Sequence, residues 1–181
     1  MKIGIAGSGG LGSNIAVNLV RSGVKNIKIV DFDIIEQSNL NRQFYFQDQI
    51  GKKKVDALSE NLYRINSKIN LEIINKKLEK ENIKSIFEDC EIIAEAFDKN
   101  IYKSMIIEEL LPLKKLIVSG NGIAHYDLEN IETKKIKDNL YIVGDFIKGI
   151  NNYKTFSTKV SIIASIMANI ILDKGGFYER I

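Results

Sequence analysis

The fold is decided by residues 1–31, which read MKIGIAGSGGLGSNIAVNLVRSGVKNIKIVD. The apolar segment Met1–Ala6 predicts a strand that leads into a glycine-rich turn. Leu11–Ser22 predicts a helix, because its apolar residues recur at helical spacing and Gly23 provides a stop. Ile27–Val30 predicts a second strand. A strand, a helix and a strand in this order are typical of a β-α-β unit, which produces a parallel sheet with a right-handed crossover.

The same alternation continues along the chain. Further helices are expected at Lys52–Asn66, Glu81–Phe87 and Asn100–Leu111, and further strands at Leu71–Asn75, Ile92–Ala96 and Leu116–Ser119. Ser38–Gly51 lacks clean periodicity and is expected to be a functional loop, with room for a short helix. Regular alternation from Met1 to Ser119 favours a Rossmann-like, doubly wound α/β fold with a mainly parallel sheet.

The pattern changes after Gly120. Ile131–Lys135 and Leu140–Val143 are expected to pair as antiparallel strands, and Thr158–Leu172 predicts an apolar helix that ends near Gly175. Core packing explains the apolar residues of this helix, and a homodimer contact on its remaining apolar face is a second role. No repeat or flexible linker interrupts the pattern, so residues 1–181 are predicted to form a single domain.

Composition excludes several classes of function. The net charge of +3 is too small to indicate a nucleic-acid partner, and the lysines are scattered. No apolar run reaches the ~18 residues of a membrane span, so no membrane partner is expected. The single cysteine, Cys90, allows no intramolecular disulfide. A reduced, cytoplasmic setting is therefore the expectation.

Residues 7–12 read GSGGLG and follow a predicted strand. In such a turn, Gly7 permits the tight bend, Gly9 lets a phosphate approach the backbone, and Gly12 allows close helix packing. The helix that follows offers free N–H groups and a positive dipole end to the phosphate. Asp31 ends the next strand, where a carboxylate can bind ribose hydroxyls. This pattern predicts an adenine nucleotide but does not separate NAD(P), FAD, SAM and ATP.

The next segment favours ATP. Residues 31–43 read DFDIIEQSNLNRQ, and Lys54 closes a Gly-x-x-Lys pattern. Cleavage of ATP at its α-phosphate needs fixed cations, because negative charge grows on the phosphoryl oxygens and the leaving pyrophosphate. Arg42 offers a forked donor and Lys54 a point charge. Asp33 is a candidate to orient the metal or the ribose.

These motifs together resemble the ThiF/MoeB/HesA family, the relatives of the ubiquitin-activating enzymes. The resemblance rests on Gly-Ser-Gly-Gly-Leu-Gly-Ser, Asp-Phe-Asp, Ser-Asn-Leu-Asn-Arg-Gln and Gly-x-x-Lys, in this order. Residues 96–100, which read AFDKN, match the place of a later family aspartate. The resemblance covers roughly Met1–Gly122 and is far more specific than the glycine turn alone.

The resemblance implies a role for each matching residue. The implied site comprises Gly7, Gly9, Gly10 and Gly12 in the nucleotide loop, Asp31 at the ribose, Asn39, Arg42, Gln43 and Lys54 at the phosphates, and Asp98 at Mg²⁺. The implied substrates are ATP and a small ubiquitin-like sulfur-carrier protein that ends in Gly-Gly. Its C-terminal carboxylate would be adenylylated. The family also implies a homodimer.

The chain also departs from family habits. Many relatives hold a structural zinc with two Cys-x-x-Cys pairs, which one cysteine cannot supply, so no zinc is expected. Cys90 precedes Asp98 and does not match a family nucleophile, so it is predicted to be a buried thiol. His125 is expected to be non-catalytic. The short chain and residues 120–124, GNGIA, resemble the compact ThiF subgroup of thiamine (thiazole) biosynthesis.

Two other classes of function remain open from the residues alone. An NAD(P)-dependent oxidoreductase explains the glycine turn and Asp31, but not Arg42 or Lys54. A non-catalytic scaffold that binds nucleotide and a ubiquitin-like protein would also carry the motifs. Within adenylylation, a tRNA base or a peptide could replace the carrier as the acceptor.

Overall fold

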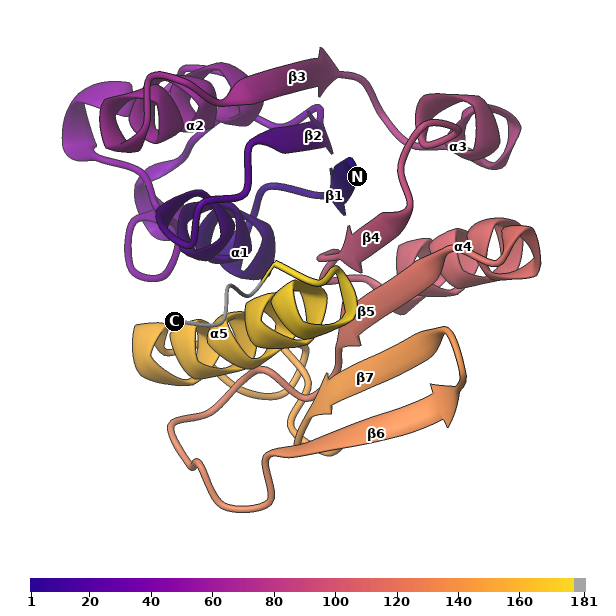
Figure 1. Cartoon of the computed structure of the whole chain (residues 1–181). Coiled ribbons are helices and arrows are strands. Elements are labelled where there is room, and N and C mark those ends of the chain that lie inside the picture. The colour runs from indigo at the N-terminus through magenta and orange to yellow at the C-terminus, as the bar shows by residue number, and fades with distance from the viewer. Residues whose placement is uncertain (178–181) are drawn as a thin grey trace, which may run out of the picture.

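A seven-stranded sheet organises residues 1–177, which are the residues that the computed structural model describes (Figure 1). Its strands are β1 (Ile3–Ala6), β2 (Asn26–Asp31), β3 (Asn70–Asn75), β4 (Ile92–Glu95), β5 (Leu116–Gly120), β6 (Glu132–Lys137) and β7 (Leu140–Gly144). The helices are α1 (Gly10–Arg21), α2 (Lys54–Ile65), α3 (Lys80–Ile86), α4 (Asn100–Leu110) and α5 (Ser157–Lys174).

The strand order is β3-β2-β1-β4-β5-β7-β6, and only the β6–β7 pair is antiparallel. The predicted Rossmann-like α/β fold and its C-terminal antiparallel pair are therefore confirmed. The direction of chain progression reverses between β1 and β4, so this is the topological switch point at which open α/β sheets bind ligands. β7 pairs parallel to β5. The loop that leaves β7 consequently reaches the same edge of the sheet as the loops after β1, β2 and β4.

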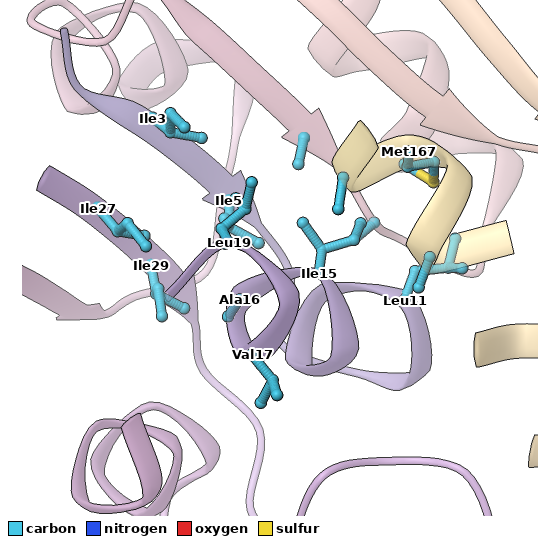
Figure 2. Packing of buried hydrophobic residues seen from close by; sticks show 14 of the residues in the cluster. Ile3, Ile5, Leu11, Ile15, Ala16, Val17, Leu19, Ile27, Ile29 and Met167 are labelled. Carbon is cyan, nitrogen blue, oxygen red and sulfur yellow. The ribbon is translucent and has the colours of Figure 1, made fainter. Parts of the chain in front are cut away.

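The two faces of the sheet are covered by different helices. Helices α1, α2 and α5 lie on one face, and α3 and α4 on the other (Figure 1). Figure 2 shows Ile3, Ile5, Ile27 and Ile29 of β1 and β2 on the side of the sheet that faces Ala16 and Leu19 of α1. Neighbouring residues of the strands point to the opposite layer, because side chains alternate along a strand. Both faces are buried, as continuous apolar strands predict.

Helix α2 begins two residues later than its periodicity predicts. Lys52 and Lys53 stay outside the helix, because Ile35 N donates to Lys52 O (2.9 Å) and an antiparallel bridge joins Ile34 to Lys53. Lys54 N then donates to Asp33 O at 2.9 Å. This pairing overrides the helical pattern and places Lys54 at the first position of α2, against the end of β2. The expected loop before it contains two short 3-10 turns, at Gln37–Asn39 and Gln47–Gln49.

Helix α5 packs along α1 and β5 with its buried face (Figure 1). Val160, Ile163, Met167 and Ile171 are buried, which confirms the predicted core packing of this helix, whereas Ile170 is only partly buried. Within residues 1–177, no helix combines the length and apolarity that a bilayer-crossing segment requires.

Cys90 lies just before β4 and is buried, with 1% of its surface exposed. Burial, together with the nearby charge of Asp89, raises the pKa of Cys90 to about 12. Because the thiolate is the reactive form, we expect the native thiol to be alkylated by iodoacetamide at pH 8 at least about a hundredfold more slowly than in the unfolded chain. Mass spectrometry of timed samples measures both rates. Equal rates would contradict the buried placement.

Candidate nucleotide site

A cavity of about 940 Å³ opens at the carboxyl ends of the parallel strands, beside the β1–β4 switch point. This volume lies within the range of small-molecule and cofactor sites. Of the sequence-predicted residues, those that line it are Gly7, Gly9, Gly10, Asp31, Asp33, Arg42, Gln43, Lys54 and Asp98. Gly12 and Asn39 lie outside the lining. Residues far apart in the sequence are thus brought together, as the motif order predicts.

The glycine loop between β1 and α1 needs glycine for two separate reasons. Gly7 has φ +94°, a left-handed conformation that costs other residues energy. A Cβ on Gly12 would lie 1.8 Å from the carbonyl oxygen of Gly7. The first turn of α1 therefore sits directly on the backbone at the end of β1. Gly10 and Leu11 of this first turn line the cavity, and the free N–H groups of a helix N-terminus can bind an anion there.

Gly12→Ala is expected to destabilise the protein strongly, because the added methyl group collides with backbone that cannot move aside. Overpacking of this kind typically costs about 1–3 kcal/mol, and a backbone clash lies at the upper end. Urea unfolding monitored by circular dichroism measures the loss. Gly149→Ala is the control, since nothing lies within 4 Å of its Cβ position. Similar stability of the two variants would refute the close packing.

Asp31 is buried and holds the glycine loop in place. Its Oδ2 accepts hydrogen bonds from Ser8 N (2.6 Å) and Ser8 Oγ (2.9 Å), and its Oδ1 accepts one from Asp33 N (2.8 Å). Tyr45 Oη donates to Ser8 O at 2.7 Å from the other side. An ionised carboxylate has about four acceptor positions, so Asp31 keeps capacity for a ribose hydroxyl. The role in shaping the loop was not predicted from the sequence.

Arg42 lies across the N-terminus of α1. Its main chain is anchored there, because Asn14 Nδ2 donates to Arg42 O at 2.9 Å and to Gly10 O at 2.7 Å. Its stem passes over Gly10, whose Cβ position is 3.6 Å from Arg42 Cγ. Among the described residues, its guanidinium bonds through Nη1 alone, to Ser38 O (3.0 Å) and Asn41 Oδ1 (2.8 Å). The remaining N–H groups are available to a phosphate.

Gln43 and Asn39 occupy different environments. Gln43 is buried in the cavity wall, and its Oε1 is the one buried side-chain oxygen or nitrogen among residues 1–177 that lacks a hydrogen-bond partner. An unpaired buried acceptor costs about 1–3 kcal/mol, so a bound nucleotide that donates to it relieves this cost. Asn39 instead accepts from Glu36 N (3.0 Å) and stabilises the 3-10 turn. Asn41 lines the cavity in its place.

Lys54 enters the cavity from the first turn of α2. Its side chain is 8% exposed, and its Nζ lies 3.0 Å from Asp33 Oδ2, which is half exposed. Lys52 and Lys53 are exposed, as predicted. Lys54 is therefore unlike an ordinary surface lysine, because lysine side chains are rarely buried to this extent.

Asp98 lies in the turn between β4 and α4 and faces the cavity. It does not cap α4, whose N-cap is Lys99 without a side-chain hydrogen bond. Within residues 1–177 no hydrogen bond or ion pair engages its carboxylate, which is exposed. The described residues contain no cluster of three or more metal-ligating side chains. A metal here would need further ligands from a bound phosphate, which is how Mg²⁺ usually binds in nucleotide sites.

One wall of the cavity was not predicted from the sequence. It consists of residues 150–157, between β7 and α5, together with Ile123. This segment is held by backbone contacts, since His125 N donates to Lys154 O at 2.7 Å. The His125 ring stacks on Tyr126 at 4.3 Å and contacts Tyr153 edge-on. His125 itself is not among the lining residues, and its non-catalytic role stays a prediction.

A buried ion pair stands at the base of this wall. Lys159 Nζ lies 2.5 Å from Asp145 Oδ2, and both residues are almost completely buried. Asp145 Oδ1 also accepts hydrogen bonds from Ile147 N (2.9 Å) and Lys148 N (2.8 Å). Burial alone would raise the pKa of Asp145, but these hydrogen bonds and the ammonium of Lys159 hold it below its ordinary value. The pair therefore fixes the chain just after β7, which leads into the wall, to helix α5.

Comparisons with known proteins agree with this geometry. The model of the ThiF family matches residues 1–173. An adenylyltransferase and sulfurtransferase UBA4 of Candida glabrata is 34% identical over 123 residues, which are 67% of this chain and 28% of that protein. A molybdopterin-synthase adenylyltransferase of Haemophilus influenzae is 32% identical over 67% of this chain and 51% of that protein. The chain thus spans about half or less of these curated relatives.

Solved structures show the same fold at low sequence identity. The E. coli tRNA N6-threonylcarbamoyladenosine dehydratase TcdA, in complex with AMP, aligns with a TM-score of 0.85 and 18% identity, over 98% of this chain and 88% of that one. E. coli MccB with ATP aligns with a TM-score of 0.75 and 23% identity, over 98% and 57% of the two chains. With the family model covering nearly the whole sequence, the chain belongs to the ThiF family.

Proposed function

We propose that the protein is an adenylyltransferase that uses ATP to activate the C-terminal carboxylate of a small ubiquitin-like carrier protein. The observation that carries the proposal is the meeting of Arg42 and Lys54 in one cavity with the glycine loop. A nucleotide whose phosphates rest at the N-terminus of α1 would have two fixed cations beside it. The names of the relatives, which are adenylyltransferases, support the same reaction.

The reaction follows from the charges in the cavity. A carboxylate oxygen of the carrier attacks the α-phosphorus of ATP, the bond to the β-phosphate oxygen breaks, and pyrophosphate leaves with the electron pair. The carboxylate is already ionised near neutral pH, so no general base is required. Arg42 and Lys54 lower the barrier by stabilising charge on the α-phosphoryl oxygens and on the leaving pyrophosphate. The glycine loop further lowers the barrier by aligning the α-phosphate for attack.

Asp98 is the residue that we propose to bind Mg²⁺. Its carboxylate is exposed to the cavity and is engaged by no other described residue, which suits a hard cation that also binds phosphate oxygens. When bound, the metal would neutralise charge on the phosphates. Asp31 would hold the ribose, since its carboxylate oxygens can accept from hydroxyl groups. Gln43, whose Nε2 lies 3.7 Å from the Cβ position of Gly9, would contact the phosphates.

We further propose that the carrier is a ThiS-like sulfur carrier that ends in Gly-Gly, in the thiazole branch of thiamine biosynthesis. The GNGIA segment at residues 120–124, which resembles the compact ThiF subgroup of thiamine biosynthesis, supports this choice. One relative acts in molybdopterin synthesis by name, so a carrier of that type is the rival substrate. The half-exposed side of α5, with Ile162 and Ile166, is our proposed homodimer contact.

ATP–pyrophosphate exchange tests the proposal. Purified protein with Mg²⁺ is assayed alone, with a ThiS-like carrier and with a molybdopterin-type carrier, and each carrier is also tested without its final glycine. Exchange that requires an intact ThiS-like carrier supports the full proposal, and exchange with the other carrier corrects the pathway. Absence of exchange with either carrier, despite ATP binding, refutes adenylylation of these proteins. Tight NADH binding in place of ATP would favour the oxidoreductase alternative.

A further inference from the structure

A buried carboxylate lies directly behind the turn that carries Asp98. Glu95, the last residue of β4, is 0% exposed and does not line the cavity. Its Oε1 accepts a hydrogen bond from Phe97 N at 2.7 Å. Its Oε2 accepts from Ser119 Oγ at 2.5 Å and from Lys103 Nζ at 3.1 Å. Nothing in the nucleotide motifs requires an acid at this position.

Burial of the Glu95 carboxylate costs free energy, so we expect a structural role that requires an acid at this position. A carboxylate removed from water loses its hydration and is tolerated only when it is paired and hydrogen-bonded. Lys103, whose side chain is 15% exposed, supplies the pairing charge and also donates to Gly120 O at 2.8 Å. The ion pair therefore joins the ends of β4 and β5 to the first turns of α4.

Glu95 and Lys103 flank the turn of residues 96–99, which carries Asp98. Glu95 enters from the strand before it, and Lys103 enters from the helix after it. Within the turn, the N–H of Phe97 is bound by Glu95, and the N–H of Ala96 donates to Ala6 O at 2.9 Å. Asp98 has no such contact through its carboxylate among the described residues. Its position in the cavity is therefore set by the backbone of this turn.

We propose that Glu95 is a positioning residue, which acts with Lys103 to hold the Asp98 turn in the geometry that binds metal-complexed nucleotide. This inference rests on the proposed function, because it assumes that ATP and Mg²⁺ bind at this cavity. Supporting contacts of this kind around a metal-binding carboxylate commonly change metal affinity by about 10–100-fold when they are removed. Glu95 touches neither substrate nor metal in this scheme.

The test compares ATP affinity with Mg²⁺ and with EDTA, by isothermal titration calorimetry. Glu95→Gln removes the charge, and the double variant Glu95→Gln/Lys103→Met removes both charges, so that no lone charge stays buried. Glu109→Gln is the matched control. Glu109 is a largely buried carboxylate on α4, the helix that carries Lys103, and it pairs with Lys80 and Lys84 outside the cavity. Thermal unfolding verifies that each variant is folded.

We expect the folded double variant to lose about tenfold in affinity for MgATP while its affinity for ATP in EDTA changes less than about twofold. Glu109→Gln should match the wild type under both conditions. An equal loss with and without Mg²⁺, or no loss at all, would overturn the positioning role while leaving the proposed function intact. A wild-type protein that binds no ATP would overturn the proposed function and this inference together.

Discussion

Arg42→Ala is expected to lower carrier-dependent ATP–pyrophosphate exchange at least about a hundredfold. Removal of one preorganised donor to a developing negative charge typically costs this much, or about 2.7 kcal/mol of transition-state stabilisation. In the structure, the stem of Arg42 lies over Gly10 at the N-terminus of α1, and its guanidinium bonds only through Nη1 within residues 1–177. No described residue bonds to its other N–H groups. The loss should therefore fall mainly on kcat, with little change in overall stability.

Arg64→Ala is the control for this prediction, since Arg64 is an exposed arginine in the last turn of α2. It should retain full exchange. Arg42→Lys should recover only part of the activity, because an ammonium cannot donate as a fork to two phosphate oxygens. Near-wild-type exchange in Arg42→Ala would remove Arg42 from the catalytic scheme and weaken the adenylyltransferase proposal as a whole.

Lys54→Ala is expected to have an effect of the same size, at least about a hundredfold on exchange. Lys54 is the buried member of the Lys52–Lys54 run, and its Nζ lies 3.0 Å from Asp33 Oδ2 at the cavity. Its loss removes the point charge from the phosphates and leaves the carboxylate of Asp33 unopposed beside them. Both changes disfavour binding of ATP, so we expect KM for ATP to rise and kcat to fall. Steady-state exchange kinetics separate the two.

Two variants sharpen this test. Lys52→Ala serves as the control, because Lys52 is two residues away, its side chain is 47% exposed, and it pairs with Glu60 at 3.2 Å. It should behave as the wild type. The double variant Asp33→Asn/Lys54→Ala distinguishes a direct role from a repulsive one. Full recovery of exchange in the double variant would show that Lys54 merely neutralises Asp33, whereas continued loss would support a direct contact with phosphate.

Much of the fold was readable because its signals are local. A strand that enters a glycine turn, followed by a helix and a second strand, occupies adjacent residues, and hydrophobic periodicity marks each element where it forms. Gly7 is required by its own positive φ, and Gly12 by its contact with the carbonyl of Gly7, five residues earlier. The late start of α2 at Lys54 shows the limit of such signals. The helix is predicted from Lys52, but strand-like pairing with residues 33–35 keeps Lys52 and Lys53 out of it.

The residues of the candidate site were likewise predicted where the signal is local and missed where it depends on the conformation of a loop. The motif order identified the residues that β1, β2 and β4 carry to one edge of the sheet, since parallel strands all end at that edge. It did not distinguish Asn39, which supports a turn, from Asn41, which lines the cavity. Both are polar residues in one loop. Which of the two faces the cavity depends on the conformation of that loop.

By itself, therefore, the sequence determined the α/β class, the glycine loop, and Arg42 and Lys54 as the cationic residues of the site. Each of these features depends on residues that are close together in the sequence. Only the tertiary structure decided that β7 lies parallel to β5, so that residues 150–157 close the cavity. It likewise decided that Lys159 pairs with Asp145, and that Glu95 stands behind Asp98 with Lys103. These features depend on strand order and on the burial of charge between remote segments, which no local pattern of residues encodes.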